Sequence, residues 1–258
     1  MGEISLDVID GVALVTLNAP QRRNAFTTSM AKEFCDVLQR VEGDEKVGAL
    51  VLRGLGSSFC SGASRSLLAL AAQDPLSEAA RADIAAVYKA FTDLGQLGIP
   101  SIAAVHGPAV GAGLNLAMAA TVRLVSEQAI FVSGFHRIGL HPGGGHLHLL
   151  ARNAGREAAA AIALFGQSVR GADAVAKGLA WELVPTDRLL ERCLEVARSA
   201  SRDRDLVRAT LASLDLSEGP PRLPWPVALE LERGAQQWSM SRIHDEGLDL
   251  PLDTEGRR

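Results

Sequence analysis

The spacing of apolar residues changes repeatedly along this chain, and each spacing predicts a strand or a helix. Residues 11–17 (GVALVTL) and 47–52 (VGALVL) are short apolar runs of the kind found in buried strands. Between them, residues 27–29 offer three hydroxyl caps, Gly43 offers a stop, and an amphipathic helix is indicated by apolar residues at Met30, Phe34, Val37, Leu38 and Val41. The pattern predicts a strand–helix–strand unit.

The alternation of strands and helices continues to about residue 156. A helical period over residues 76–94 ends at glycines and a proline, and residues 102–105 form another strand-like run. A glycine-rich turn, a short apolar helix over 114–120 and strands over 122–125 and 129–132 are expected next. Strands alternating with helices predict an α/β fold with parallel strands.

Strand signals fade after residue 156 and alanine-rich, helix-favouring sequence follows. Residues 215–226 (DLSEGPPRLPWP) hold four of the eleven prolines and predict a linker into a last helix over 227–240. Residues 64–77 show little regular patterning. The chain is therefore divided into an α/β core over 1–200 and a helical C-terminal region over 201–258.

Composition narrows the class of protein. With 258 residues, 47% apolar and 22% charged, the chain is long and apolar enough to bury a core. A net charge of −4 argues against a nucleic acid partner. Three distant cysteines suggest neither a disulfide framework nor a zinc site, and we expect a cytoplasmic setting. No signal peptide or membrane segment is expected, because the most apolar stretch, 108–120, is too short to span a bilayer.

Two glycine-containing turns, over residues 57–64 and 107–113, each follow a predicted strand and precede helical sequence. Turns of this kind can direct backbone N–H groups toward an anion or a developing oxyanion. For either turn alone, the simpler interpretation is that the glycines only form a tight turn, and the pair of turns is more informative. Neither a dinucleotide fingerprint nor a phosphate-binding loop is matched, and the serine-hydrolase elbow fails at its last position, which is Ser66.

Four motifs resemble, in order and spacing, the signatures of the crotonase, or enoyl-CoA hydratase/isomerase, superfamily. They are RNAF at 23–26, FCSGA at 59–63, IPSIAAVHGPAVGAG at 99–113 and RIGLHPGGG at 137–145. A helical stretch over 172–184 extends the resemblance, which covers most of the chain. It implies an α/β crotonase-like spiral of ββα units with a helical C-terminal trimerisation region, assembled as a homotrimer or a dimer of trimers.

The same resemblance implies binding of an acyl-CoA thioester and stabilisation of its enolate, with coenzyme A as part of the substrate and no separate cofactor. The two oxyanion-hole N–H groups fall on Ala63 and Ala112, with Gly111 beside them. The acyl-CoA channel and the site for the CoA nucleotide are assigned, by similarity, to Ala63, Ser64, Arg65, Ser66, Arg23 and Ala25.

The acid and base residues depart from the family pattern. The two glutamates of hydratases correspond to Asn115 and Phe135, and a third carboxylate station is Gly143. Asn115 can orient a water molecule but cannot take its proton. Histidine is the remaining acid/base candidate, because imidazole titrates near neutral pH. Here His136 is the first choice and His141 the second.

The other histidines and the cysteine are assigned structural roles. His146, His148 and His106 are interpreted as packing residues, no metal site is predicted, and Cys60 is expected to be a buried thiol. The function predicted is therefore an enzyme of the enoyl-CoA hydratase/isomerase type with non-standard acid/base residues. The alternatives are an acyl-CoA-binding protein that has lost the chemistry, and an isomerase or decarboxylase on the same fold.

Overall fold

The computed structural model describes residues 2–217 and 224–245 and is built around a six-stranded sheet in the order β1-β2-β3-β4-β6-β9. β1 (Ile4–Ile9) pairs antiparallel with β2 (Val12–Leu17). All the other neighbours are parallel, and they are β3 (Ala49–Gly54), β4 (Ser101–Val105), β6 (Val122–Val125) and β9 (Glu182–Leu183). The predicted α/β class with parallel strands is confirmed.

A second, three-stranded sheet includes part of the second glycine-containing turn, residues 108–110. β5 (Pro108–Val110) pairs parallel with β7 (Ile130–Val132), and β7 pairs antiparallel with β8 (Val169–Arg170). The short strands β8 and β9 lie where the sequence showed no strand signal. They are only two residues long, which is too short to display a period of two.

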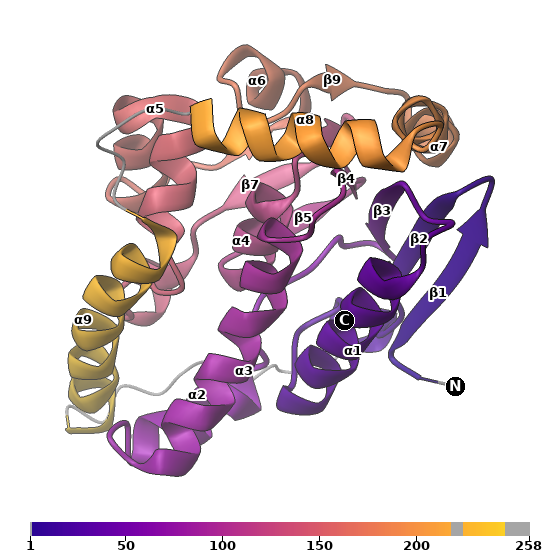
Figure 1. Cartoon of the computed structure of the whole chain (residues 1–258). Helices are drawn as coiled ribbons and strands as arrows, with labels where there is room; N and C mark the ends of the chain where they lie inside the picture. The colour runs from indigo at the N-terminus through magenta and orange to yellow at the C-terminus, as the bar shows by residue number, and fades with distance from the viewer. Residues whose placement is uncertain (1, 218–223, 246–258) are drawn as a thin grey trace.

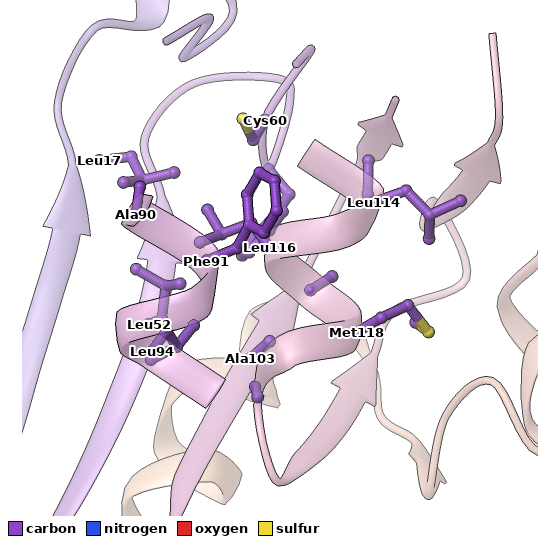
Figure 2. Packing of buried hydrophobic residues seen from close by; sticks show 14 of the residues in the cluster. Leu17, Leu52, Cys60, Ala90, Phe91, Leu94, Ala103, Leu114, Leu116 and Met118 are labelled. Atoms are coloured by element: carbon purple, nitrogen blue, oxygen red, sulfur yellow. The ribbon is translucent and has the colours of Figure 1, made fainter. Parts of the chain in front are cut away.

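Both faces of the six-stranded sheet are covered by helices (Figure 1). On one face lie α1 (Thr28–Gly43), α3 (Glu78–Gly95) and α4 (Ala112–Ala119). Figure 2 shows Leu94 of α3 beside Leu52 of β3, and Phe91 of α3 and Leu114 of α4 belong to the same buried cluster. The other face is covered by α7 (Leu189–Ala200). A sheet buried on both sides explains why its strands are continuous apolar runs.

Residues 64–77, which showed little pattern, contain the regular helix α2 (Arg65–Gln73). Ser64 caps it by accepting a hydrogen bond from the Leu67 N–H at 3.3 Å. α5 (His146–Ala163), which is interrupted at Gly155, and α6 (Gly171–Ala176) follow. Three single turns of 3-10 helix, Pro20–Arg22, Phe135–Ile138 and Thr186–Arg188, complete this part of the chain.

The C-terminal region contains α8 (Arg204–Ser217) and α9 (Trp225–Asp245). Arg208 of α8 pairs with Glu42 at the end of α1 at 3.0 Å, and α9 runs beside α2 and α5 in Figure 1. The predicted linker 215–226 is therefore wrong at both ends, where helix replaces it, and residues 218–223 lie outside the described chain. The division at residue 200 and the role in trimerisation stay predictions.

Candidate active site

The two glycine-containing turns are joined to each other by backbone hydrogen bonds. The Cys60 N–H donates to the Pro108 carbonyl at 3.2 Å, and the Cys60 carbonyl accepts from the Val110 N–H at 3.0 Å. An isolated parallel bridge pairs Cys60 with Ala109. Turns separated by about fifty residues are thereby held side by side in one register.

Glycine is required where the two turns cross. A β-carbon on Gly62 would lie 2.7 Å from the Val110 carbonyl oxygen and 3.3 Å from the Ala112 nitrogen. A β-carbon on Gly113 would lie 2.1 Å from the Cys60 carbonyl oxygen, closer than any side chain allows. The glycines therefore permit an approach between two backbones, rather than only a change of direction.

The N–H groups of Ala63 and Ala112 are oriented by their surroundings. In the bridge between Ala63 and Phe26, it is the Gly62 carbonyl and the Ser64 N–H that bond to Phe26, so the N–H of Ala63 faces the other way. Ala112 is the first residue of α4, where backbone N–H groups have no acceptor within the helix. Both residues line the same cavity.

This cavity has a volume of about 210 Å³. Its walls come from the two turns, α2, α3, the 133–143 segment and α9, and they are mostly apolar, with Leu68, Ile84, Val87, Val110, Phe135, Ile138 and Leu140. The polar side chains in the lining are Ser61, Arg65, Tyr88, Asn115, Ser133 and Gln236. A largely apolar cavity with few polar groups is the usual form of a small-molecule site.

Asn115 stands on α4 one turn beyond Gly111 and is 1% exposed. Its Nδ2 donates to the Gly143 carbonyl at 3.0 Å, and its Oδ1 lies 2.7 Å from Nδ1 of His146. The other ring nitrogen of His146, Nε2, lies 2.9 Å from Oγ of Ser133. His146 is completely buried, and burial, followed by the charge of His136, lowers its pKa to about 3. The imidazole is therefore neutral.

α9 contributes two buried polar side chains behind and beside the cavity. Gln236 lines it and accepts a hydrogen bond from the Tyr88 hydroxyl. Glu232 accepts from the backbone N–H groups of His146 and Leu147 at 2.9 and 3.1 Å, at the start of α5. Burial raises the pKa of Glu232 to about 7, although these hydrogen bonds act in the opposite direction.

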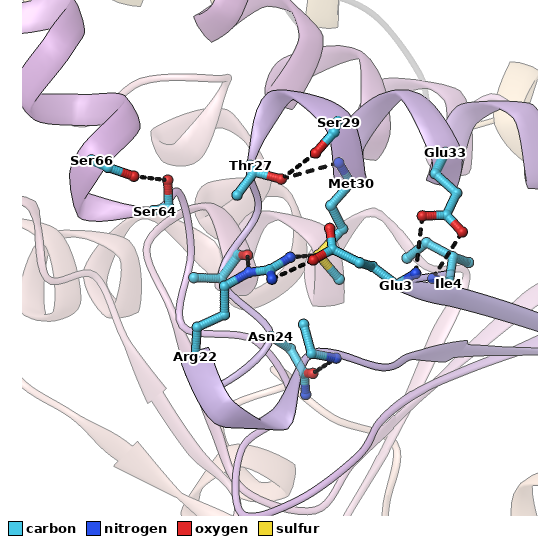
Figure 3. A network of polar contacts seen from close by, with 12 residues as sticks. Glu3, Ile4, Arg22, Asn24, Thr27, Ser29, Met30, Glu33, Ser64 and Ser66 are labelled. Atoms are coloured by element: carbon cyan, nitrogen blue, oxygen red, sulfur yellow. Dashed lines mark hydrogen bonds and ion pairs between the residues drawn. The ribbon is translucent and has the colours of Figure 1, made fainter. Parts of the chain in front are cut away.

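A polar network fixes the segment that enters the first turn (Figure 3). The Asn24 side chain is fully buried, accepts from the Ala19 N–H and donates to carbonyl oxygens of Leu55 and Ser58. Arg22 pairs with Glu3 in the same network. The network sets the position of the chain immediately beside the Phe26–Ala63 bridge.

Five residues predicted from the sequence meet at the cavity, namely Ala63, Arg65, Gly111, Ala112 and Asn115. Others do not belong to its lining: Arg23 is exposed, Ala25 is buried, and Ser64 and Ser66 bond to each other at 3.2 Å at the start of α2. Their contact with coenzyme A stays a prediction.

The two histidines chosen for acid/base chemistry lie outside the cavity lining. His136 is exposed on the 3-10 turn after β7, and His141 is half-buried with its Nδ1 2.6 Å from the Pro142 carbonyl oxygen. Sequence reasoning instead missed Ser133, Tyr88 and Gln236, and it treated His146 as a packing residue. Cys60 matches its expectation, because burial raises its thiol pKa to about 12.

Comparison with known proteins identifies the family. The profile described as Enoyl-CoA hydratase/isomerase matches residues 7–223. The chain belongs to this family. It is 39% identical over 241 residues to a "Probable enoyl-CoA hydratase EchA14" from Mycobacterium tuberculosis, with 92% of each chain covered.

Solved structures of enoyl-CoA hydratase/isomerase proteins share the fold. An enoyl-CoA hydratase from Mycobacterium avium subsp. paratuberculosis matches with a TM-score of 0.78 at 27% identity, over 93% of this chain and 94% of that one. A monofunctional enoyl CoA isomerase from M. smegmatis matches with a TM-score of 0.71 at 30% identity, over 86% and 97%. The crotonase-like fold expected from the four motifs is confirmed.

Neither a membrane-spanning helix nor a metal-binding cluster is found among the described residues. Within residues 2–217 and 224–245, no helix combines the length and apolarity that crossing a bilayer requires. In the same ranges, no cluster of three histidine, cysteine, aspartate or glutamate side chains could hold a metal ion.

Proposed function

We propose that the cavity binds an acyl-CoA thioester and stabilises its enolate, with the thioester oxygen accepting hydrogen bonds from the N–H groups of Ala63 and Ala112. The observation that carries the proposal is the pairing of the two turns through Cys60, which brings both alanines to the lining of one cavity. Two fixed donors favour the enolate, and losing one typically costs about 3 kcal/mol of transition-state stabilisation.

The acyl group would occupy the apolar part of the cavity between α2, α3 and the 133–143 segment. Arg65 in its lining offers a positive charge for a phosphate of coenzyme A. Family membership supports the thioester as substrate, and coenzyme A would enter as part of that substrate.

The described residues in the lining include no aspartate or glutamate. A hydratase needs one group to activate water and another to deliver a proton, so this lining favours isomerisation or another enolate reaction over the two-glutamate hydration mechanism. Proton transfer by His136 or His141 stays a prediction from the sequence. It fails if His136→Ala and His141→Ala variants both turn over at the rate of the unmodified enzyme.

The oxyanion assignment is tested by removing one donor. Ala112→Pro deletes the N–H at the first position of α4, where proline is tolerated, whereas Ala112→Ser keeps it. Exchange of the α-protons of butyryl-CoA with D2O, followed by NMR, reports enolate formation directly. We expect a loss of 100-fold or more in exchange for the proline variant, and a rate near that of the unmodified enzyme for the serine variant.

The acyl-CoA-binding alternative gives a different result. Calorimetry would then detect binding of butyryl-CoA and crotonyl-CoA, while α-proton exchange and the absorbance of the conjugated thioester both stay unchanged. Undiminished exchange in Ala112→Pro would exclude the proposed donor even if the protein is an enzyme.

A further inference from the structure

Ser133, His146 and Asn115 form a continuous hydrogen-bonded chain whose two ends, Ser133 and Asn115, line the cavity. They come from three separate places: the residue after β7, the first residue of α5, and α4. All three side chains belong to buried residues, with His146 completely enclosed between the other two. The family resemblance had assigned no chemistry to Ser133 or His146.

The direction of the hydrogen bonds follows from the Asn115 amide. Because Nδ2 donates to the Gly143 carbonyl, Oδ1 is the atom facing His146, and it can only accept. Nδ1 of His146 must then carry the hydrogen, which leaves Nε2 with its lone pair. Nε2 then accepts from the Ser133 hydroxyl, so the hydroxyl hydrogen points toward the ring.

A serine that donates to an imidazole, which in turn is held by a carboxamide oxygen, has the hydrogen-bond pattern of an activated nucleophile. Ser133 also stands beside the turn that contains Ala112. The Gly111 N–H donates to the Val132 carbonyl at 3.0 Å, and a β-carbon on Gly111 would lie 3.5 Å from the Ser133 carbonyl oxygen. The backbone of Ser133 thus lies beside the turn that carries Ala112, and Ser133, Ala63 and Ala112 line the same cavity.

We propose that this enzyme also hydrolyses acyl-CoA thioesters, with Ser133 as the nucleophile and with His146 and Asn115 as the residues that activate and position it. The inference rests on the binding of an acyl-CoA put forward above. In the first step, Oγ of Ser133 attacks the thioester carbonyl carbon and its proton passes to Nε2 of His146. The N–H groups of Ala63 and Ala112 hold the tetrahedral oxyanion.

The intermediate then collapses by breaking the carbon–sulfur bond. The CoA sulfur leaves and takes the proton from Nε2, which forms free CoA thiol and an acyl ester on Ser133. In the second half, water attacks the ester, passes its proton to Nε2, and Oγ leaves and takes that proton back. The products are one carboxylic acid and one CoA thiol for each thioester and water consumed.

The His146 imidazole suits acyl transfer better than removal of an α-proton, which the proposed function does not assign to it. A neutral imidazole without a carboxylate partner is a weak base, and a thioester α-proton is only weakly acidic. Attack on a thioester carbonyl, by contrast, gives a tetrahedral intermediate from which the CoA sulfur is a good leaving group. The carboxamide of Asn115 keeps the tautomer that attack requires, although it supplies no negative charge.

The test follows thiol release and the acyl-enzyme in the full-length protein. Acetyl-, butyryl- and octanoyl-CoA are incubated with the enzyme, and free CoA is measured with a thiol-reactive chromophore. The three protein cysteines are buried, which keeps the background low. We expect thiol release, a mass increase equal to one acyl group, and that group on the peptide containing Ser133.

Ser133→Ala should reduce thiol release 100-fold or more and abolish the adduct, while α-proton exchange by the same sample continues. Ser199→Ala, on the outer face of α7, is the matched control and should change neither. Ser133→Cys keeps a nucleophile of nearly the same shape, and an acyl group should accumulate on Cys at that position even if the alanine variant folds poorly. The single variant His146→Gln should lose thiol release to the same extent as Ser133→Ala.

Three outcomes would overturn the inference: α-proton exchange without thiol release in the unmodified enzyme, release at an unchanged rate in Ser133→Ala, or an acyl group mapped to another residue. The first of these leaves the enolate proposal intact. Failure of all three thioesters to bind would instead remove the proposed function on which the inference rests.

Discussion

Glu232 on α9 accepts a hydrogen bond at 2.9 Å from the backbone N–H of His146, the residue at which α5 begins. The contact joins the C-terminal helix to the wall of the cavity. Both groups are buried, and burial shifts their titrations in opposite directions: it raises the pKa of Glu232 to about 7 and lowers that of His146 to about 3.

The two shifts have opposite effects on stability. The pKa of Glu232 is higher in the folded protein than its ordinary 4.5. Its contribution to the free energy of unfolding is therefore fully present below pH 4.5 and is lost as the pH rises toward 7. His146 has a lower pKa folded than its ordinary 6.5, so its contribution is present above pH 6.5 and is lost as the pH falls toward 3. Between pH 4.5 and 6.5 the two slopes largely cancel.

Glu232→Gln should expose the slope of His146. Relative to the unmodified protein, its free energy of unfolding should fall by about 1.4 kcal/mol for each pH unit as the pH is lowered from 6.5 to 4.5. Urea unfolding at four pH values across this range measures the difference. Glu230→Gln, on the exposed side of the same helix, should show no such trend. Equal pH dependence of the unfolding free energy in the two variants would contradict the proposed cancellation of the Glu232 and His146 slopes.

The strands and long helices could be predicted because their signals are local. Thr27 caps α1 as its position before the apolar stripe indicated, by accepting from the Met30 N–H at 3.1 Å. α2 escaped detection because its buried stripe is narrow. Leu67 and Ala71 face the interior one turn apart, whereas Leu70 between them is 63% exposed, so the helical period is blurred.

The backbone of the candidate site was predictable together with two of its side chains, Arg65 and Asn115, which closely follow the two turns. The two turns could be recognised because each directly follows a strand and precedes helical sequence, and the structure brings Ala63 and Ala112 to one cavity. Which histidine faces inward could not be predicted. His136 and His146 both lie in irregular or terminal segments, where no period relates position to direction, and only tertiary packing encloses His146 between Ser133 and Asn115.

Asn24 should be among the polar residues that matter most for stability. Its fully buried side chain accepts a hydrogen bond from the Ala19 N–H. The same side chain donates to the carbonyl oxygens of Leu55, Ser58 and Phe59. Removing the side chain leaves these groups without their partner, so we expect Asn24→Ala to lower the free energy of unfolding by about 3 kcal/mol.

A second variant separates the lost hydrogen bonds from backbone strain. Asn24 has φ of +56°, which disfavours alanine but not glycine. If the hydrogen bonds dominate, Asn24→Gly should be destabilised nearly as much as Asn24→Ala in urea unfolding. Asn153→Ala, which loses a single half-buried bond to the Leu149 carbonyl, should lose about 1 kcal/mol or less. A fully stable Asn24→Gly would show that backbone conformation is the cause.

The crossing of the two turns gives the sharpest steric prediction. In Gly113→Ala the new β-carbon would stand 2.1 Å from the Cys60 carbonyl oxygen, and because that atom is backbone, one of the turns must move. We expect the free energy of unfolding to fall by about 2 kcal/mol or more and the α-proton exchange of butyryl-CoA to fall with it, since Ala63 and Ala112, the proposed donors, would be displaced relative to each other.

Gly43→Ala is the matched control, because a β-carbon there meets no atom within 4 Å at the end of α1. Alanine favours helix over glycine, so this variant should be as stable as the unmodified protein or gain up to about 1 kcal/mol. Thermal unfolding and the exchange assay are applied to both variants. If Gly113→Ala kept full exchange activity, the close approach of the turns would not be what positions the two donors, and the proposed oxyanion site would have to lie elsewhere.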